Sequence, residues 1–429
     1  SYHGDMARLQ GWLTAPGKPP TLRAYGRLQG QAQVSHAAGV VSGRLDATVT
    51  KLVMQNADGR QFQDPEAKLT ARGSYQSSTD QLKLDEMLLA TTALGVRAAG
   101  QVDSLSANPK VNLTGRLGYD WQRLTPLLQS YAGDQIIFAG RGDRLMTFAG
   151  PLDPAVAQAA AAVDWTGAYV YGFQFGPGVL DARLAGGVVE CAPLDLSVSE
   201  GRLSARPRLR LSPEPMLLEV EPGRLIQQVR INPNMCAQGL QYIAPVLAGV
   251  ATAEGRFSID LDQCRIRLDD PAQSELSGRF TVHTIEIGPG ALVRELAVVL
   301  NRATAAKLQR ESVIRFHLAK GRVYHEGLEL VFPEMTVRTY GSVGVTDQTM
   351  SLVAEMPIPP KWLAGNQVLD SALKNQVLKV PIRGTLGKPA IDHRTLDQYN
   401  KSLLRNATKN VIEGELNRQL DRLFQPPKR

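Results

Sequence analysis

Apolar and polar side chains alternate one by one along most of this chain of 429 residues. In the stretch 202–211 (RLSARPRLRL), the alternation places leucines and an alanine on one side of an extended chain and four arginines on the other. A period of two is typical of a β-strand, whose successive side chains point to opposite faces of a sheet. The same alternation recurs at 314–318, 328–332 and 350–356. The chain is therefore expected to form sheets that have one apolar face.

Short turn signals separate these stretches, at 212–214, 320–321 and 346–348. Strands joined by such short turns pair as an antiparallel meander. Pro207 lacks a main-chain donor, so it predicts an edge or a bulge in its strand.

Two segments, 187–205 and 321–339, align without gaps at a separation of 134 positions. In both, a glycine opens the segment, a leucine-polar-leucine group follows, and a glutamate precedes an apolar residue by three positions. Each segment then leads into a methionine-led stretch, at 216–220 and 350–356. A shared spacing this long predicts that one β-rich unit is used more than once.

Helical patterns are fewer and fall between the blocks of strands. We expect helices at 120–131, 153–163, 234–248 (with Asn234 as its N-cap), 291–309, 360–376 and 395–424. The last of these is amphipathic, with a basic polar face, and it either packs on the sheet or lies on a membrane surface.

The predicted fold is mainly β (β-rich α+β): an elongated, curled antiparallel sheet built from repeated meander units, with interspersed helices and a C-terminal amphipathic helix. We expect four parts, namely an N-terminal β-rich module over 1–150 with a helix near 120–131, a middle β repeat unit over 151–231, a third β module over 232–393, and the amphipathic helix over 394–429.

The net charge of +7 and the pI of about 9.3 make the chain mildly basic, which favours acidic partners such as anionic lipid heads. No stretch approaches the roughly 18 apolar residues that a membrane span needs. The chain begins Ser1-Tyr2-His3, without an initiator methionine or a signal peptide. We therefore expect a processed or excised piece whose membrane anchor lies outside it.

The residues that carry most enzyme chemistry are scattered. Six histidines form no zinc-binding pair, although His317 and His325 flank a turn, and neither a nucleophile elbow nor a phosphate-binding loop occurs. Three cysteines lack any CxxC spacing; Cys236 and Cys264 either pair in an oxidising compartment or remain buried thiols. Aromatic residues make up 6% of the chain and do not interleave with the arginines, as nucleic-acid binding requires. We expect no enzyme activity, cofactor, metal site or nucleic-acid partner.

The C-terminal half carries a more specific pattern. A strand at 350–356 is followed by PIPPKWL at 357–363, a helix, and LKVPIRGTLGKPAID at 378–392. This order resembles the C-terminal region of AsmA-like proteins, in which a final strand reads roughly V-P-I-x-G-T-L-x-K-P. The resemblance covers about Asn232 to Asp392, and 321–325 and 231–236 look like the versions in large AsmA-like proteins of planctomycete-type bacteria. The membrane-spanning helix with which such proteins usually begin is absent here.

The resemblance implies a bridge-like lipid transport protein of the cell envelope, anchored in the inner membrane through a segment missing from this chain and projecting into the periplasm. Its cargo would be phospholipid or another acyl lipid, and its partners would be membranes and envelope proteins that serve outer-membrane biogenesis. The apolar strand faces supply candidates for a lipid groove, and methionines add contacts that adapt to varied tails. These candidates are Leu194, Leu196, Leu203, Leu209, Leu211, Met216, Leu218, Ile314, Phe316, Leu318, Leu328, Leu330, Phe332, Met335, Val337, Met350, Leu352 and Met356.

A second hypothesis uses the same residues differently. Every β-sandwich also has one apolar face per sheet, closed by a second layer. The chain would then be a structural or scaffolding protein of the envelope, with a closed core and no lipid cargo.

Overall fold

A computed structural model describes residues 1–6, 22–56, 61–288, 290–300, 306–308, 312–332, 335–357, 377–396 and 398–399. The chain divides into two compact units. Unit 1 comprises Ser1–Val198 and Ala205–Glu219, and unit 2 comprises Ser199–Ser204 and Val220–Arg429. Both are mainly β, as the alternation predicts.

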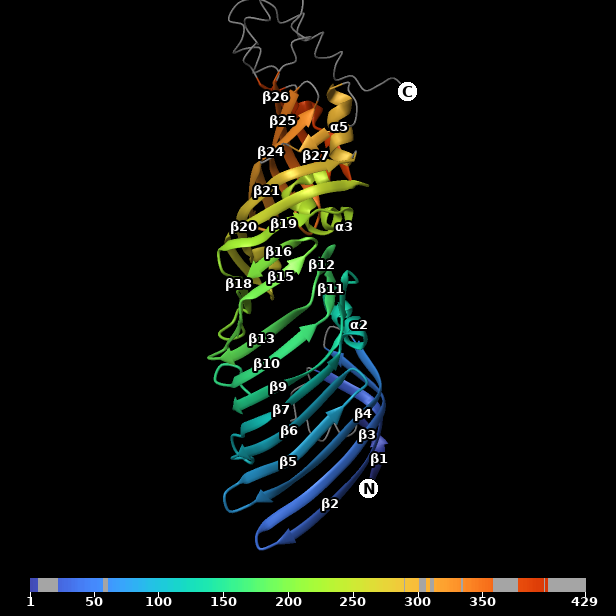
Figure 1. Ribbon diagram of the computed structural model, residues 1–429, viewed down its shortest axis with the longest axis vertical. Helices are drawn as coiled ribbons and strands as arrows, with labels where there is room; N and C mark the ends of the chain where they lie inside the picture. The colour runs from blue at the N-terminus through green and yellow to red at the C-terminus, as the bar shows by residue number, and fades with distance from the viewer. Residues whose placement is uncertain are drawn as a thin grey trace, which may run out of the picture. The chain divides into compact units, whose positions relative to one another are not determined.

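Unit 1 is an antiparallel meander in which each long strand pairs with the next (Figure 1). Its main strands are β1 (Tyr2–Asp5), β2 (Leu22–Ala37), β3 (Val40–Asn56), β4 (Gln61–Gln76), β5 (Gln81–Ala90), β6 (Leu94–Asp103), β7 (Lys110–Asp120), β9 (Arg141–Gly150), β10 (Gln158–Trp165), β13 (Gly178–Ala185), β14 (Val188–Cys191) and β17 (Pro207–Arg210). Four shorter strands pair in the order β8 (Ile136–Ala139), β11 (Gly167–Val170), β12 (Phe173–Phe175) and β15 (Leu194–Val198). Pro207 is the first residue of β17, and β16 (Gly201–Ala205) ends two positions before it, so the chain 202–211 forms two strands and not one.

Unit 2 continues the meander pattern with helices packed on its sheet. Its strands are β19 (Gly223–Arg230), β20 (Ala253–Arg267), β21 (Glu275–Ile287), β22 (Ala306–Leu308), β23 (Val313–Ala319), β24 (Arg322–Phe332), β25 (Met335–Gly344), β26 (Thr349–Pro357), β27 (Val377–Thr385) and β28 (Lys388–Ile391). Its helices are α3 (Pro233–Met235), a π-helical turn (Cys236–Leu240), α4 (Gln241–Ile243), 3-10 turns at Pro245–Leu247 and Pro271–Gln273, and α5 (Ala291–Leu300). β18 (Leu217–Val220) lies at the boundary between the units.

The antiparallel meander is confirmed, but the curled form is not. Among the described strands, the sheet neither closes nor curls strongly. Strong curvature needs bulges or glycine kinks repeated from strand to strand. In unit 1, the ladders β2–β3, β4–β5 and β5–β6 have one register shift each, whereas β3–β4, β6–β7 and β7–β9 have none, so the shifts do not repeat from strand to strand.

The predicted helices have mixed outcomes. α2 (Trp121–Ala132) confirms the first: Asp120 is its N-cap and accepts a hydrogen bond from the Gln122 amide at 3.1 Å. The helix expected at 153–163 is wrong, because β10 pairs on both sides, with β9 and β13. Alanine favours helix only weakly, and the two ladders outweigh that preference.

Two further helices are shorter than expected. The segment 234–248 breaks into brief helical turns, and its cap is Asn232, which accepts from the Met235 amide at 3.0 Å, rather than Asn234. The helix expected at 291–309 ends at Leu300, and 306–308 form β22. The expected helix at 360–376 lies outside the described residues. So does most of the C-terminal amphipathic helix, of which 395–396 and 398–399 are described and are helical.

The two aligned segments occupy comparable places in the meander. Gly187 and Gly321 both have a left-handed backbone, with φ of 77° and 70°, and each lies in a turn directly before the first residue of a strand. The strands that follow are β14 and β24.

Candidate functional site

One face of the unit 1 sheet is apolar across eleven neighbouring strands: β2 to β7, β9, β10, β13, β14 and β17. Residues directly opposite each other in antiparallel strands point to the same face. The strand registers connect one face throughout, and we call it the unit 1 apolar face. One member from each strand is, in order, Val34, Leu45, Leu69, Leu84, Val96, Leu113, Phe148, Ala161, Leu180, Val189 and Leu209.

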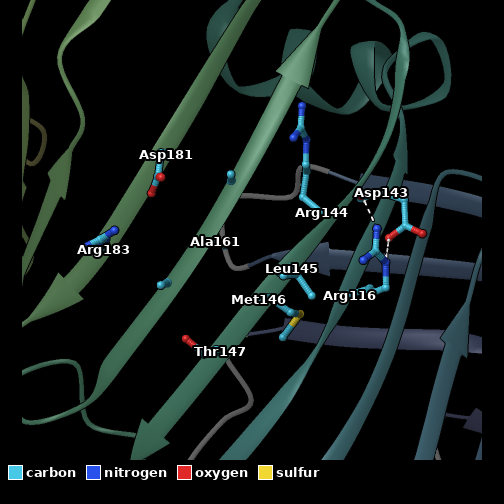
Figure 2. Close-up of a pocket in the computed structure, with 11 residues that line it drawn as sticks. Arg116, Asp143, Arg144, Leu145, Met146, Thr147, Ala161, Asp181 and Arg183 are labelled. Carbon is cyan, nitrogen blue, oxygen red and sulfur yellow. Dashed lines mark hydrogen bonds and ion pairs between the residues drawn. The ribbon is translucent and has the colours of Figure 1, made fainter.

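The opposite face of the same strands is polar. Arg44 pairs there with Asp46 at 2.8 Å, and Arg116 pairs with Asp143 at 2.9 Å. A depression of about 440 Å³ lies on this polar side and is lined in part by Thr147, Asp181 and Arg183 (Figure 2). Some of the charged side chains that line it already form ion pairs with each other, as the dashed contacts between Arg116 and Asp143 show. The two faces of unit 1 thus differ in composition: one carries charged and polar side chains, and the other carries mainly apolar ones.

Most residues of the unit 1 apolar face are nevertheless only half-buried. Val34 is 69% exposed, Leu45 38% and Leu89 39%. A small cluster of Leu28, Val49, Leu52 and Ala67 is buried at one end. Apolar side chains of a sheet are usually covered by a second layer. Over much of this face, the described residues supply no such second layer, and the side chains stay partly accessible.

Side-chain size varies in an ordered way across this face. On β4 the central residues Ala71 and Gly73 are small, and Leu69 and Tyr75 flank them. β6 repeats this with Ala98 and Gly100 between Val96 and Val102. On β10 and β13 the centre is Ala161 opposite Ala182. On the strands between them the opposite residues are large, with Met87 opposite Ala71 and Met146 opposite Ala161, so small and large side chains alternate from strand to strand across the middle of the face.

Helix α2 packs at one end of the face. Leu124 of the helix joins Ala93 and Tyr119 in a buried cluster, and Val163 of β10 packs against it. Trp121 stacks on Phe138 with 4.9 Å between ring centroids. The helix thus bounds the apolar face on the side of the β8–β11 pair.

Tyr119 fills an interruption in the ladder between β9 and β10. The ladder ends at the pair Met146–Ala161, and beyond it the Tyr119 hydroxyl accepts from the Asp164 amide at 2.6 Å and donates to the Asp164 carboxylate. Arg144 donates to the same carboxylate at 2.8 Å and holds the pKa of Asp164 below its usual value. Partial burial raises the pKa of Tyr119. The Tyr119 hydroxyl therefore takes the place of the ladder partner that the Asp164 amide lacks.

The apolar face of unit 2 is closed. Ile314, Leu328, Leu330, Val337 and Met356 are 0% exposed, and Leu352, Met350 and Phe316 are 1%, 3% and 4% exposed. The covering residues come from the helical segments, and Met235, Val246, Leu247, Leu292 and Leu296 are also fully buried. Unit 2 therefore has the packed two-layer core of the second hypothesis.

The remaining candidates lie in several settings. Leu318 and Met335 are half-buried, and the side chain of Phe332 is outside the described residues. Leu196 is buried, whereas Leu194, Leu203, Leu209, Leu211 and Leu218 are half-buried. Near β18 the buried residue is Leu217, at 5% exposure, while Met216 is 40% exposed. Of the eighteen candidates, Leu209 is joined by the strand registers to the unit 1 apolar face.

Most residues of the unit 1 apolar face are absent from the sequence-based candidates. Their alternation is present in the sequence, for example at Leu82-Lys83-Leu84, but alanine and glycine occupy many of the apolar positions. Alanine and glycine give a weak apolar signal, so the sequence pattern alone does not single out these strands.

His325 lies inside the unit 2 core at 3% exposure. Its Nε2 is 3.3 Å from the Thr339 hydroxyl, and its Nδ1 has no hydrogen-bond partner among the residues that the structure describes. Burial lowers the pKa of His325 from 6.5 to about 4.

This histidine predicts an acid-sensitive stability. The unfolded chain takes up a proton as the pH falls below 6.5, whereas the folded chain does so only near pH 4, so stability is lost within this window. We expect the free energy of unfolding to fall by about 2 kcal/mol between pH 7 and pH 5 from this group alone. Urea unfolding of the wild type and of His325→Gln at both pH values measures it. An equal pH dependence in the two proteins would contradict the assignment.

Other kinds of site are not found within the described ranges. They contain no group of three or more metal-ligating side chains, and no helix in them is long and apolar enough to span a membrane. Cys236 and Cys264 are free thiols, so the disulfide alternative is not observed. Burial raises the pKa of Cys236 to about 12, which makes it an inert core residue.

Comparison with models of known protein families, with curated proteins and with solved structures yields no match for this chain.

Proposed function

We propose that this chain is a non-enzymatic carrier of acyl lipids, and that the acyl chains lie on the unit 1 apolar face. The observation that carries the proposal is the continuity of this half-exposed face over eleven strands. A monomeric protein rarely leaves a contiguous apolar surface of this kind uncovered unless it binds something there.

The energetics favour a lipid. Removing an acyl chain from water is worth about 0.8 kcal/mol per methylene, so a chain of about sixteen carbons that crosses water unaided meets a barrier on the order of 10 kcal/mol. A continuous apolar path lowers that barrier at every point along the way. Small residues such as Ala71 and Ala161 alternate with the larger Met87 and Met146 on neighbouring strands, and the uneven apolar surface that results offers gaps in which acyl tails can pack.

The resemblance to AsmA-like proteins supports the cellular part of the proposal. Its residues in 350–392 suggest a periplasmic protein of the cell envelope that moves phospholipid between membranes or assists outer-membrane assembly. We also propose that the segments 187–205 and 321–339 descend from one repeated meander unit.

The scaffolding hypothesis retains support in unit 2, whose apolar face is sealed by its own helices. We assign a structural role to unit 2 and the lipid-binding role to unit 1. The groove candidates of unit 2 then serve as core residues.

Site-specific photo-crosslinking tests the proposal. A benzophenone amino acid replaces Leu84, on the apolar face, or its neighbour Lys83, on the polar face of the same strand. We expect lipid adducts at position 84, detected by mass spectrometry of the intact chain, and few at position 83. Equal capture at both positions, or none at either in folded protein, would contradict it.

A further inference from the structure

Arg144 interrupts the apolar character of the unit 1 apolar face. Among the described residues of β6, β7, β9, β10, β13, β14 and β17, the registers place a single charged residue on this face, Arg144, directly opposite Leu117. The other residues that they place there are aliphatic, aromatic or sulfur-containing, or are glycine. A charge among such side chains is costly once a ligand covers it, unless the ligand brings a partner for it.

The surroundings of Arg144 change from apolar to polar along the strand. In one direction along β9, the next residues on the same face are Met146 and Phe148, which are half-buried. In the other direction, Gly142 lies opposite Tyr119, and Trp121 of α2 donates to the Asp164 carbonyl at 2.6 Å. Tyrosine and tryptophan suit a boundary that is apolar on one side and wet on the other. Arg144 therefore lies where the apolar face meets a polar margin.

The Arg144 guanidinium is held in place and keeps donors for a ligand. One of its Nη atoms donates to the Asp164 carboxylate at 2.8 Å, and the Tyr119 hydroxyl donates to the same carboxylate. A guanidinium carries five N–H donors, so this bond leaves others available. The side chains of Arg144 and Asp164 are 44% and 30% exposed, and an ion pair so exposed contributes little to stability.

We infer that Arg144 binds the anionic head group of an acyl lipid, a carboxylate or a phosphate, whose tail lies on the unit 1 apolar face. Arginine binds both groups through pairs of parallel hydrogen bonds. The tail then extends from Arg144 over Met146 and Phe148, away from helix α2. The inference rests on the proposed function, because the tail has to lie on this face, and it adds that unit 1 selects lipids by the charge of their heads.

Pairs of lipids that differ only in the charge of the head test the inference. The first pair is a fluorescent fatty acid and its methyl ester, and the second is phosphatidic acid and diacylglycerol with the same tails. We expect the wild type to bind the charged member of at least one pair about tenfold more tightly. Arg144→Gln is expected to bind both members of that pair equally, and Arg144→Lys to keep part of the preference. A preference in the first pair alone identifies a carboxylate, and one in the second pair alone identifies a phosphate.

Arg183→Gln is the matched control. The ladder between β9 and β10 ends before Arg144, so Arg144 also borders the depression of the polar side, to which Arg183 belongs (Figure 2). We expect Arg183→Gln to keep the full preference for the charged lipid. Loss of the preference in this variant would place the anion in the depression and overturn the inference. Circular dichroism of each variant controls for folding.

The wild type alone separates the inference from the proposed function. Equal binding of the charged and uncharged members of both pairs would overturn the inference and leave the proposed function standing. Binding of no member of either pair would contradict the proposed function, and the inference with it.

Discussion

Ala161→Trp is expected to remove most of the lipid that the chain holds, whereas Ala162→Trp is expected to leave it bound. The two alanines are adjacent on β10 and point to opposite faces, Ala161 to the apolar face and Ala162 to the polar one. An indole at position 161 projects from the apolar face beside Met146 and displaces part of an acyl chain. Displacing about four methylenes costs about 3 kcal/mol, or about a hundredfold in affinity.

Titration with a fluorescent fatty acid, together with mass spectrometry of co-purified lipid, measures this loss. Circular dichroism of both variants controls for folding. If Ala162→Trp loses lipid as fully as Ala161→Trp, the acyl chains do not lie on the unit 1 apolar face.

Leu330→Asp is expected to unfold unit 2, with a loss of about 4 kcal/mol or more in the free energy of unfolding. Leu330 is 0% exposed in the core of unit 2, and a carboxylate there would lack water and any counter-charge. The half-buried Leu84 of unit 1 is the comparison, and Leu84→Asp is expected to cost about 1 kcal/mol, because water reaches that position.

Hydrogen exchange followed by mass spectrometry, on peptides from β24 to β26, reports the stability of unit 2 in each variant. A Leu330→Asp protein that protects these strands as the wild type does would mean that water reaches Leu330, and the assignment of unit 2 as a sealed core would be wrong.

The strand content of this protein can be predicted from its sequence because alternation is a local property. The stretch 350–356 alternates between apolar and other residues, and β26 buries its apolar members Met350, Leu352, Ala354 and Met356. The N-cap Asp120 likewise marks the start of α2 through a local interaction. Local signals fail where strand pairing determines the secondary structure. The alanines of β10 predict a helix, but pairing with β9 and β13 makes the segment a strand.

The position of the candidate site could not be predicted, because it depends on which apolar face is left uncovered. Leu330 and Leu84 have similar surroundings in sequence, each within an alternating strand. What separates them is distant in the chain: the helical residues Leu247 and Leu292 share the core of unit 2. Coverage is a tertiary property, and alternation carries no information about it.

The open side of unit 1 also sets what kind of selectivity such a protein can have. Its flanking residues Leu69 and Tyr75 stand six positions apart on β4, about 20 Å along the strand, with Ala71 and Gly73 between them. Cargo held there would meet mostly methyl, methylene and ring carbons. Double-bond kinks and methyl branches in the acyl chain would therefore affect affinity. On β4, phosphates and sugars would project into the solvent and would not contribute to selectivity.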